Sequence, residues 1–204
     1  MPRVSAEQNP RPLGGALILA AGFGRRFGSD KRAYQLPDGR SLLEATVERY
    51  AEAYADLCVV LRPEDESLAR RIRALPGNPE IALSPDAELG MGHSLAAGVR
   101  TIADHWQWAS VGLGDMPFIA TATLRELLDV FFSNGAESIV QPVHEGRPGH
   151  PVTFPGSCFA AMCRLEGDQG ARAIVETAEQ VIRHPVADKG VLDDVDTPAA
   201  AENQ

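Results

Sequence analysis

The sequence has little positive charge and little cysteine, and both shortages exclude classes of protein. Of the 204 residues, 19 are Lys or Arg and 28 are Asp or Glu, so the formal net charge is −9. A protein that coats nucleic acid needs a basic face, and this balance argues against that class. The three cysteines, Cys58, Cys158 and Cys163, are odd in number and form no CxxC pair. They are typical of reduced, structural thiols in a reducing compartment.

A long hydrophobic run is also missing. The one signal-like stretch, 13–24, is too short to span a bilayer and has the length of the apolar region of a secretory signal. A secretory signal would be followed by a small-residue cleavage site, whereas residues 22–31 form a glycine-rich basic loop. We therefore expect a cytoplasmic protein that associates with neither membrane nor nucleic acid.

Short apolar runs alternate with segments of helical periodicity. The expected strands are 16–21, 57–61, 81–83, 110–114, 137–143 and 152–154. Helices are expected between the first five strands and after the last, and a turn is expected at 145–149. This alternation predicts a three-layer α/β/α sandwich with a Rossmann-like, mostly parallel sheet. Residues 1–12 are polar and proline-containing, which predicts a disordered tail, and 13–204 are expected to form a single domain.

Three signals predict where helices begin. Ser41 with Glu44, and Thr123 with Glu126, have the spacing of capping boxes. Asp168 is expected to cap the helix that follows it.

The loop after the first expected strand has the composition of a phosphate site. Ligands of open parallel sheets bind beyond the carboxyl ends of the strands, so the loops there are the first candidates. Residues 19–31 read LAAGFGRRFGSDK. The glycines let backbone N–H groups approach phosphate, and Arg26 and Lys31 supply positive charge. We expect a triphosphate here; the alternative is a glycine turn with solvated basic side chains.

Two better-known phosphate motifs do not fit this loop. Lys31 follows Asp30 and not Gly, and no Ser or Thr comes next, so the loop is not a Walker motif. Phe27 stands where the dinucleotide fingerprint has its third glycine, and two arginines crowd the place of the pyrophosphate.

Carboxylates at two further places predict a magnesium site. Asp115 directly follows the expected strand 110–114, and Asp194 and Asp196 share one side of the chain if that segment is extended. Mg²⁺ is usually held by one or two carboxylates together with substrate phosphates. The alternative for the second pair is the acidic N-terminus of a short terminal helix.

A third loop, 90–95 (GMGHSL), precedes an expected helix, so its N–H groups are placed to contact a base or ribose. It also resembles a nucleophile elbow, in which Ser94, with Asp115 or Asp168 and with His184, would form a serine hydrolase. That rival is weakened because an elbow needs a strand before the serine and 89–92 is a poor one. A second rival is a nucleotide-binding protein or cofactor chaperone without turnover, because positioning residues serve binding as well as catalysis.

Taken in order, these motifs resemble the MobA-like nucleotidyltransferases, and within them the molybdenum cofactor cytidylyltransferases. Residues 19–31 match the opening pattern LAAGxGxRxGxxK, 114–117 match GDxP, and 90–95 match the base-contact loop. Further matches are GHPV at 149–152, GDQGAR at 167–172 and DVDTP at 194–198. The sequence departs from the family pattern at Arg25, Phe27 and His93, where Ser or Thr, Met, and a small residue are commoner.

The resemblance implies a fold of the nucleotide-diphospho-sugar transferase type and a transfer reaction. A terminal phosphate oxygen of a phosphorylated pterin would attack the α-phosphorus of a nucleoside triphosphate and expel pyrophosphate. Arg26, Lys31 and Asp115 would then be catalytic, and Asp115 with Asp194 or Asp196 would hold Mg²⁺. The residues implied in nucleotide binding are Leu19, Ala20, Ala21, Gly22, Gly24, Arg25, Gly28, Gly92 and Ser94.

His150 would line the acceptor site, or alternatively would orient a strand turn. Residues 20–22 (AAG) resemble the cytidylyl branch, which favours CTP over GTP. The alternatives are guanylyl transfer and transfer to another phosphorylated acceptor. A molybdoenzyme receiving the cofactor would be the implied protein partner.

Overall fold

The computed structural model describes residues 12–23 and 30–195. They form an eight-stranded sheet of order β3-β2-β1-β4-β7-β5-β6, in which β8 also pairs with β5. The strands are β1 (Gly14–Leu19), β2 (Leu57–Leu61), β3 (Glu80–Leu83), β4 (Trp108–Leu113), β5 (Ile139–His144), β6 (Arg147–Pro148), β7 (Val152–Pro155) and β8 (Val181–Pro185). All pairings are parallel except those of β6 and β7, so the prediction of a mostly parallel sheet is confirmed.

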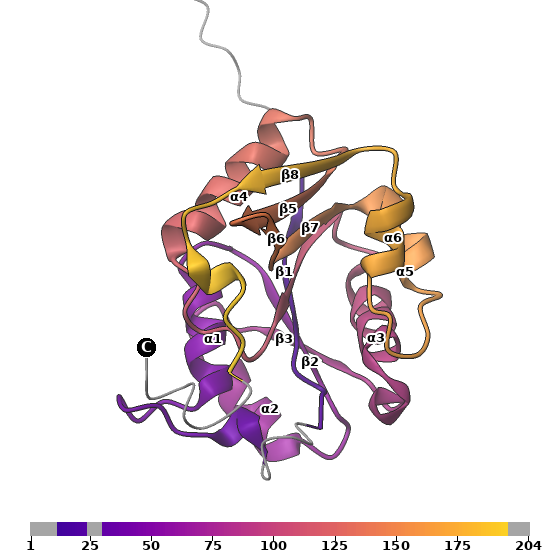
Figure 1. Cartoon of the computed structure of the whole chain (residues 1–204). Coiled ribbons are helices and arrows are strands. Elements are labelled where there is room, and N and C mark those ends of the chain that lie inside the picture. The colour runs from indigo at the N-terminus through magenta and orange to yellow at the C-terminus, as the bar shows by residue number, and fades with distance from the viewer. Residues whose placement is uncertain (1–11, 24–29, 196–204) are drawn as a thin grey trace, which may run out of the picture.

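Helices cover both faces of this sheet, as Figure 1 shows. On one face lie α1 (Leu42–Ala51), α2 (Glu66–Arg73) and α4 (Thr121–Ser133), and on the other α3 (Met91–Ile102), α5 (Phe159–Met162) and α6 (Arg172–Thr177). Short 3₁₀ turns are η1 (Lys31–Ala33), η2 (Ala87–Leu89), η3 (Gly156–Cys158) and η4 (Lys189–Val191). In the part of the chain described, no helix is both long and apolar enough to cross a membrane.

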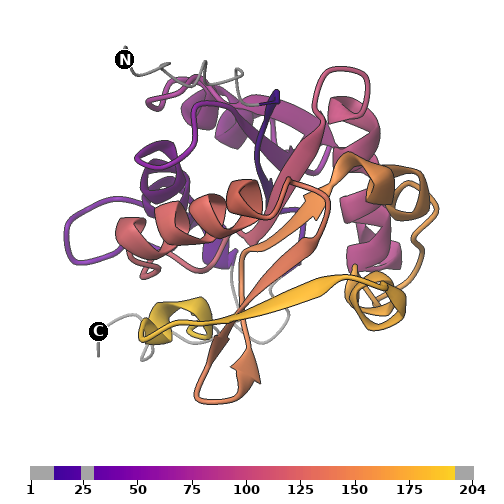
Figure 2. The same ribbon diagram turned by 90° about the horizontal axis from the view of Figure 1, so that it is seen from above.

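Strand β1 is buried on both faces and joins the two halves of the core. Its side chains alternate: Ala16 and Ile18 pack with the α1 and α4 side, whereas Leu17 and Leu19 pack with the α3 side. Side chains of a strand point to opposite faces in turn, so only a continuous apolar run serves a strand between two helical layers. Viewed from above, the sheet passes between these layers (Figure 2).

Only one of the three cap predictions is confirmed. Ser41 and Glu44 form both hydrogen bonds of a capping box at the start of α1. The Thr123 prediction is wrong, because α4 begins two residues earlier and Thr123 is buried within it. The N–H of its N-cap residue, Ala120, donates instead to Asp188, 2.8 Å away and distant in sequence. The Asp168 prediction is also wrong, because α6 starts at Arg172 with Ala171 as its N-cap.

The three cysteines are unpaired, as the sequence predicts. Cys58 is buried in β2, and its burial raises the pKa of the thiol to about 12. That thiol is protonated and unreactive at neutral pH.

Gly112 lets the sheet approach α1 closely just before the functional loop. A Cβ atom at this position would lie 2.7 Å from Cζ of Tyr50 and closer still to its hydroxyl. We expect Gly112→Ala to lower the free energy of unfolding by about 1–3 kcal/mol through overpacking, measured by urea denaturation. Tyr50→Phe removes the nearest atom, so the same alanine should cost less in the Tyr50→Phe background. An equal cost in both backgrounds would contradict this account.

Candidate active site

The carboxyl ends of β1 and β4 mark a switch in strand order. From β1 the chain adds β2 and β3 on one side and then returns with β4 on the other. Leu19 and Leu113 are the last pair in register, and the Gly114 N–H donates to the Leu19 carbonyl at 2.9 Å. Open α/β sheets bind ligands in the crevice at such a point. The loops 20–23 and 114–117 therefore meet at one crevice.

Asp115 stands in this crevice with one of its oxygens unused. Lys31 Nζ donates to Asp115 Oδ2, and the two side chains are 18% and 14% exposed. Within the described residues, the buried Oδ1 has no hydrogen-bond partner. Buried polar atoms are almost always satisfied, and exceptions mark catalytic groups or places for an ion or water. Asp115 Oδ1 is thus an open ligand position.

The C-terminal segment brings a second carboxylate beside this loop. The Val195 N–H donates to the Asp115 carbonyl at 3.0 Å, and Val195 is buried. Asp194, the preceding residue, is exposed. Asp115 and Asp194 both act electrostatically on the ring of His150, so both lie near one imidazole. Asp196 falls outside the described residues.

These two carboxylates fit Mg²⁺. It prefers oxygen ligands and is usually bound by one or two carboxylates plus substrate phosphates and water. Residues 12–23 and 30–195 contain no group of three or more His, Cys, Asp or Glu that could hold a metal ion by themselves. The unused Asp115 Oδ1, together with Asp194, suits a cation that is shared with a bound triphosphate.

His150 is a neutral polar group at the same place. Burial lowers the pKa of its imidazole below the ordinary value, although the Val111 backbone, Asp115 and Asp194 act in the opposite direction. Its backbone N–H donates to the Val191 carbonyl at 2.8 Å, which fixes the loop between β6 and β7. Nδ1 is buried and, in the described structure, lacks a partner. The ring can therefore give or accept one hydrogen bond to a ligand without adding charge.

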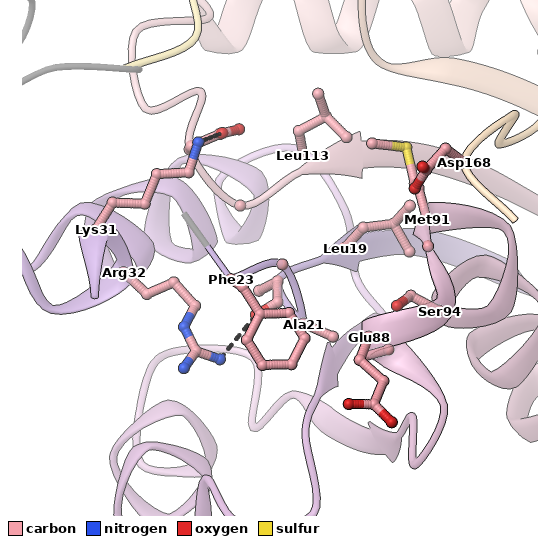
Figure 3. Close-up of a pocket in the computed structure, with 16 residues that line it drawn as sticks. Leu19, Ala21, Phe23, Lys31, Arg32, Glu88, Met91, Ser94, Leu113 and Asp168 are labelled. Atoms are coloured by element: carbon pink, nitrogen blue, oxygen red, sulfur yellow. Dashed lines mark hydrogen bonds and ion pairs between the residues drawn. The ribbon is translucent and has the colours of Figure 1, made fainter. Parts of the chain in front are cut away.

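The crevice opens into a first pocket of about 390 Å³, which we call the switch pocket (Figure 3). It is built from the loop after β1, from η1, from the η2–α3 region and from the end of β4. The lining residues are Leu19, Ala20, Ala21, Gly22, Phe23, Lys31, Arg32, Ala87, Glu88, Gly90, Met91, Ser94, Leu113, Gly114, Asp115 and Asp168.

Most sequence-predicted site residues that the structure describes meet in this pocket. The exceptions are Gly92, Asp194 and His150, which do not line it. Gly92 packs instead against the 166–167 backbone, and its N–H donates to the Gly167 carbonyl at 2.7 Å. The expected loop at 90–95 is already helical, since α3 begins at Met91. Gly24, Arg25, Arg26 and Gly28 lie outside the described residues.

Arg32 lines the switch pocket and was not among the site residues expected from the sequence. Its side chain is 4% exposed, and Nη1 donates to the Ala20 carbonyl at 2.9 Å. Its guanidinium also pairs with Asp30 and, across 33 residues of sequence, with Asp65. Arg32 thereby ties the backbone of the β1 loop to the start of α2. Nothing local in the sequence distinguishes it from the neighbouring basic residues.

A second pocket of about 670 Å³ adjoins the first and shares Leu19, Met91 and Leu113 with it. We call it the outer chamber. Its floor is the α3-side face of β4, β7, β5 and β8, and its roof includes α3 and α6. The lining is mostly apolar, with Gln141, His150, Arg172, Glu176 and Arg183 as its polar side chains. Gln141 and Arg183 are register partners on β5 and β8.

The serine hydrolase constellation is not assembled. Ser94 is buried in the first turn of α3, where its hydroxyl accepts from Ser84 at 3.3 Å. His184 Nε2 instead lies 2.7 Å from Glu126 on α4, the helix on the opposite face of the sheet. The residues that the motif would unite are therefore separated by the sheet.

Comparisons with known proteins place this geometry in a class. A family model described as "MobA-like NTP transferase domain" matches residues 16–184. Rv0371c from Mycobacterium tuberculosis H37Rv has a similar structure, with TM-score 0.78, 29% identity and coverage of 93% of this chain and 95% of that chain. The same protein in complex with manganese gives TM-score 0.68 at 27% identity, covering 85% and 88%.

Two curated relatives are also similar. Purine catabolism protein PucB of Bacillus subtilis is 30% identical over 193 residues, covering 89% of this chain and 91% of the relative. A probable molybdenum cofactor guanylyltransferase of Methanosarcina acetivorans is 26% identical over 141 residues, covering 67% and 60%. Fold and site thus define a nucleotidyltransferase of the Rossmann-like α/β type. The chain belongs to the MobA-like NTP transferase family.

Proposed function

We propose that the protein transfers CMP from CTP to the terminal phosphate of molybdopterin, in a reaction that depends on Mg²⁺ and releases pyrophosphate. The observation that carries the proposal is Asp115, which lines the switch pocket with an unused oxygen and acts electrostatically on His150 in the wall of the adjoining outer chamber. One pocket would take the triphosphate and the other the acceptor, so the α-phosphate and the attacking phosphate would meet beside this carboxylate.

The chain's own residues would mainly align the two substrates and neutralise the negative charge of their phosphates. The acceptor phosphate oxygen forms a bond to the α-phosphorus while the bond to the β-phosphate oxygen breaks, and the electron pair leaves with pyrophosphate. The attacking oxygen is already ionised, so no general base is required, and such reactions depend on positioning and on charge stabilisation. Mg²⁺ held by Asp115 and Asp194 would supply part of that charge. Lys31, beside Asp115, would supply more, and Arg26 is proposed for the leaving pyrophosphate on sequence alone.

The lining of the outer chamber suits a flat acceptor with polar edges. Its volume lies in the range that buries a small organic ligand, and its apolar floor suits a ring system. Gln141 and Arg183 are neighbours on that floor, where an amide and a guanidinium can hydrogen-bond a heterocycle or an anionic group. His150 lines the chamber near Asp115, and the acceptor phosphate would lie beside these two residues.

Base choice is the least constrained part of the proposal. The proposal favours CTP because residues 20–22 (AAG) resemble the cytidylyl branch, whereas the relative in Methanosarcina acetivorans carries the name of a guanylyltransferase. We place the reaction in the cytoplasm, in keeping with three unpaired cysteines.

The test is an assay of pyrophosphate release with purified protein, molybdopterin and each of CTP, GTP, ATP and UTP, with and without Mg²⁺. We expect release with CTP that needs both molybdopterin and Mg²⁺, and a dinucleotide product seen by mass spectrometry. Release with GTP alone would make the protein a guanylyltransferase. Nucleotide binding without release would point to another phosphorylated acceptor.

A further inference from the structure

A free carboxylate lies in the wall of the switch pocket. Glu88 lines the pocket from the η2 turn and is exposed. Among the residues described, it takes part in no hydrogen bond and no ion pair. An unpaired negative charge opposes the binding of a polyanionic triphosphate unless it faces a part of the ligand that carries donors. Its position relative to the phosphates therefore decides what it does.

Glu88 lies at the end of the pocket away from Lys31 (Figure 3). Figure 3 shows Lys31 and Glu88 on opposite sides of the pocket, with Ala21 and Phe23 between them, and Ser94 beside Glu88. The proposed reaction places the phosphates near Lys31 and Asp115. The base of a nucleotide that spans the pocket would then lie against Glu88, Ser94 and the apolar side chains of Ala87 and Met91.

The turn that carries Glu88 is held in place from two sides. Ala87 is buried, and the Gly90 N–H donates to its carbonyl at 3.3 Å. Gly90 packs against the backbone of Gly167, so closely that a Cβ atom would not fit. A recognition group is selective only when its support is fixed, and this backbone meets that condition.

Carboxylates accept hydrogen bonds and donate none when ionised. Cytosine carries an amino group at C4, and a Glu that accepts from this amine is a known way of reading the base. Uracil has a carbonyl oxygen at the same position, so it would set two acceptors against each other. The Ser94 hydroxyl, which lines the same pocket and accepts from Ser84 at 3.3 Å, is a second group able to hydrogen-bond the base.

We propose that Glu88 is a specificity-determining residue that selects an amino-bearing base, cytosine in the first place, by accepting a hydrogen bond from its exocyclic amine. The inference rests on the proposed function, because that function assigns the triphosphate to this pocket.

The test compares wild type with Glu88→Gln, measuring the Kd of CTP and of UTP by calorimetry with Mg²⁺ and no acceptor. The variant keeps the size of the side chain and can donate as well as accept. We expect wild type to prefer CTP over UTP by about tenfold or more, and the variant to lose most of this preference, with weaker CTP and tighter UTP binding. Glu179→Gln, at an exposed residue that lines neither the switch pocket nor the outer chamber, is the matched control and should behave as wild type.

The possible outcomes distinguish failure of this inference from failure of the proposed function on which it rests. Equal weakening of CTP and UTP in Glu88→Gln, or no change in their ratio, overturns the role of Glu88 and leaves cytidylyl transfer intact. If wild type binds GTP and not CTP, the proposed base is wrong. Glu88 is then tested by comparing the Kd of GTP with that of ITP, which lacks the exocyclic amine. If Glu88→Gln leaves the ratio of these two Kd values unchanged, the inference is overturned for GTP as well. Failure to bind any triphosphate overturns both proposals.

Discussion

Asp115→Asn is expected to lower kcat for pyrophosphate release by about 10³-fold. The substitution keeps the shape of the side chain but removes the charge from the carboxylate whose Oδ1 is unused and whose Oδ2 pairs with Lys31. Metal-ion stabilisation of a developing phosphate charge supplies several kcal/mol, and a loss of about 4 kcal/mol corresponds to that factor. Rates at saturating CTP and a series of Mg²⁺ concentrations check the value.

The loss should be confined to the metal-dependent step. Because ligands stabilise the native state they bind, CTP without Mg²⁺ should still raise the Tm of the Asp115→Asn variant, which also shows that the variant is folded. Asp104→Asn, on the exposed turn after α3, is the matched control and should keep full activity. Turnover of Asp115→Asn near the wild-type rate would show that the metal assignment is wrong.

The sequence predicted the parts of the site that lie on single loops. Glycines after β1 and an aspartate after β4 are local signals, and the rule that ligands bind at the carboxyl ends of parallel strands placed them together. The structure agrees in bringing Lys31 to Asp115 and Val195 to the Asp115 loop. The meeting of the β1 and β4 loops follows from the strand order, whereas the contact of Val195 depends on the path of the C-terminal segment.

What could not be predicted depends on pairs distant in sequence. Strand β8 was not among the expected strands because its residues, VIRHP, form neither a continuous apolar run nor an alternation of apolar and polar residues, and it is defined by pairing with β5. The start of α4 was misplaced because Asp188, from a different part of the chain, accepts from the Ala120 N–H. A local capping rule does not contain such a partner.

Glu88 shows a second reason why part of the site could not be predicted from the sequence. Its type and place in the sequence are those of an ordinary solvated residue in a turn. The packing of Gly90, directly after η2, against the backbone of Gly167 helps to make Glu88 part of a pocket wall. Residues that determine specificity can therefore lie next to a recognised motif without belonging to its pattern.

Arg32→Met is expected to lower the free energy of unfolding by about 3 kcal/mol. Breaking a buried ion pair by removing one partner is strongly destabilising, and here Asp65, which is 9% exposed, would lose Arg32 and keep Arg62 alone. For a chain of this size the Tm should fall by roughly 6–12 °C, measured by calorimetry. Arg40→Met removes an exposed arginine that pairs with Asp38 and Glu48, and should cost under about 1 kcal/mol.

Arg32→Met should also weaken nucleotide binding, because Arg32 donates to the carbonyl of Ala20 in the wall of the switch pocket. That carbonyl loses the donor that holds it, so the β1 loop gains freedom and the triphosphate must order it again on binding. We expect KM for CTP to rise about tenfold at a temperature well below the Tm of Arg32→Met, with a smaller change in kcat. In the Asp65→Asn background the stability cost of Arg32→Met should shrink, since the buried ion pair between Arg32 and Asp65 is already absent. A full cost in that background would assign the role of Arg32 to packing and not to the ion pair.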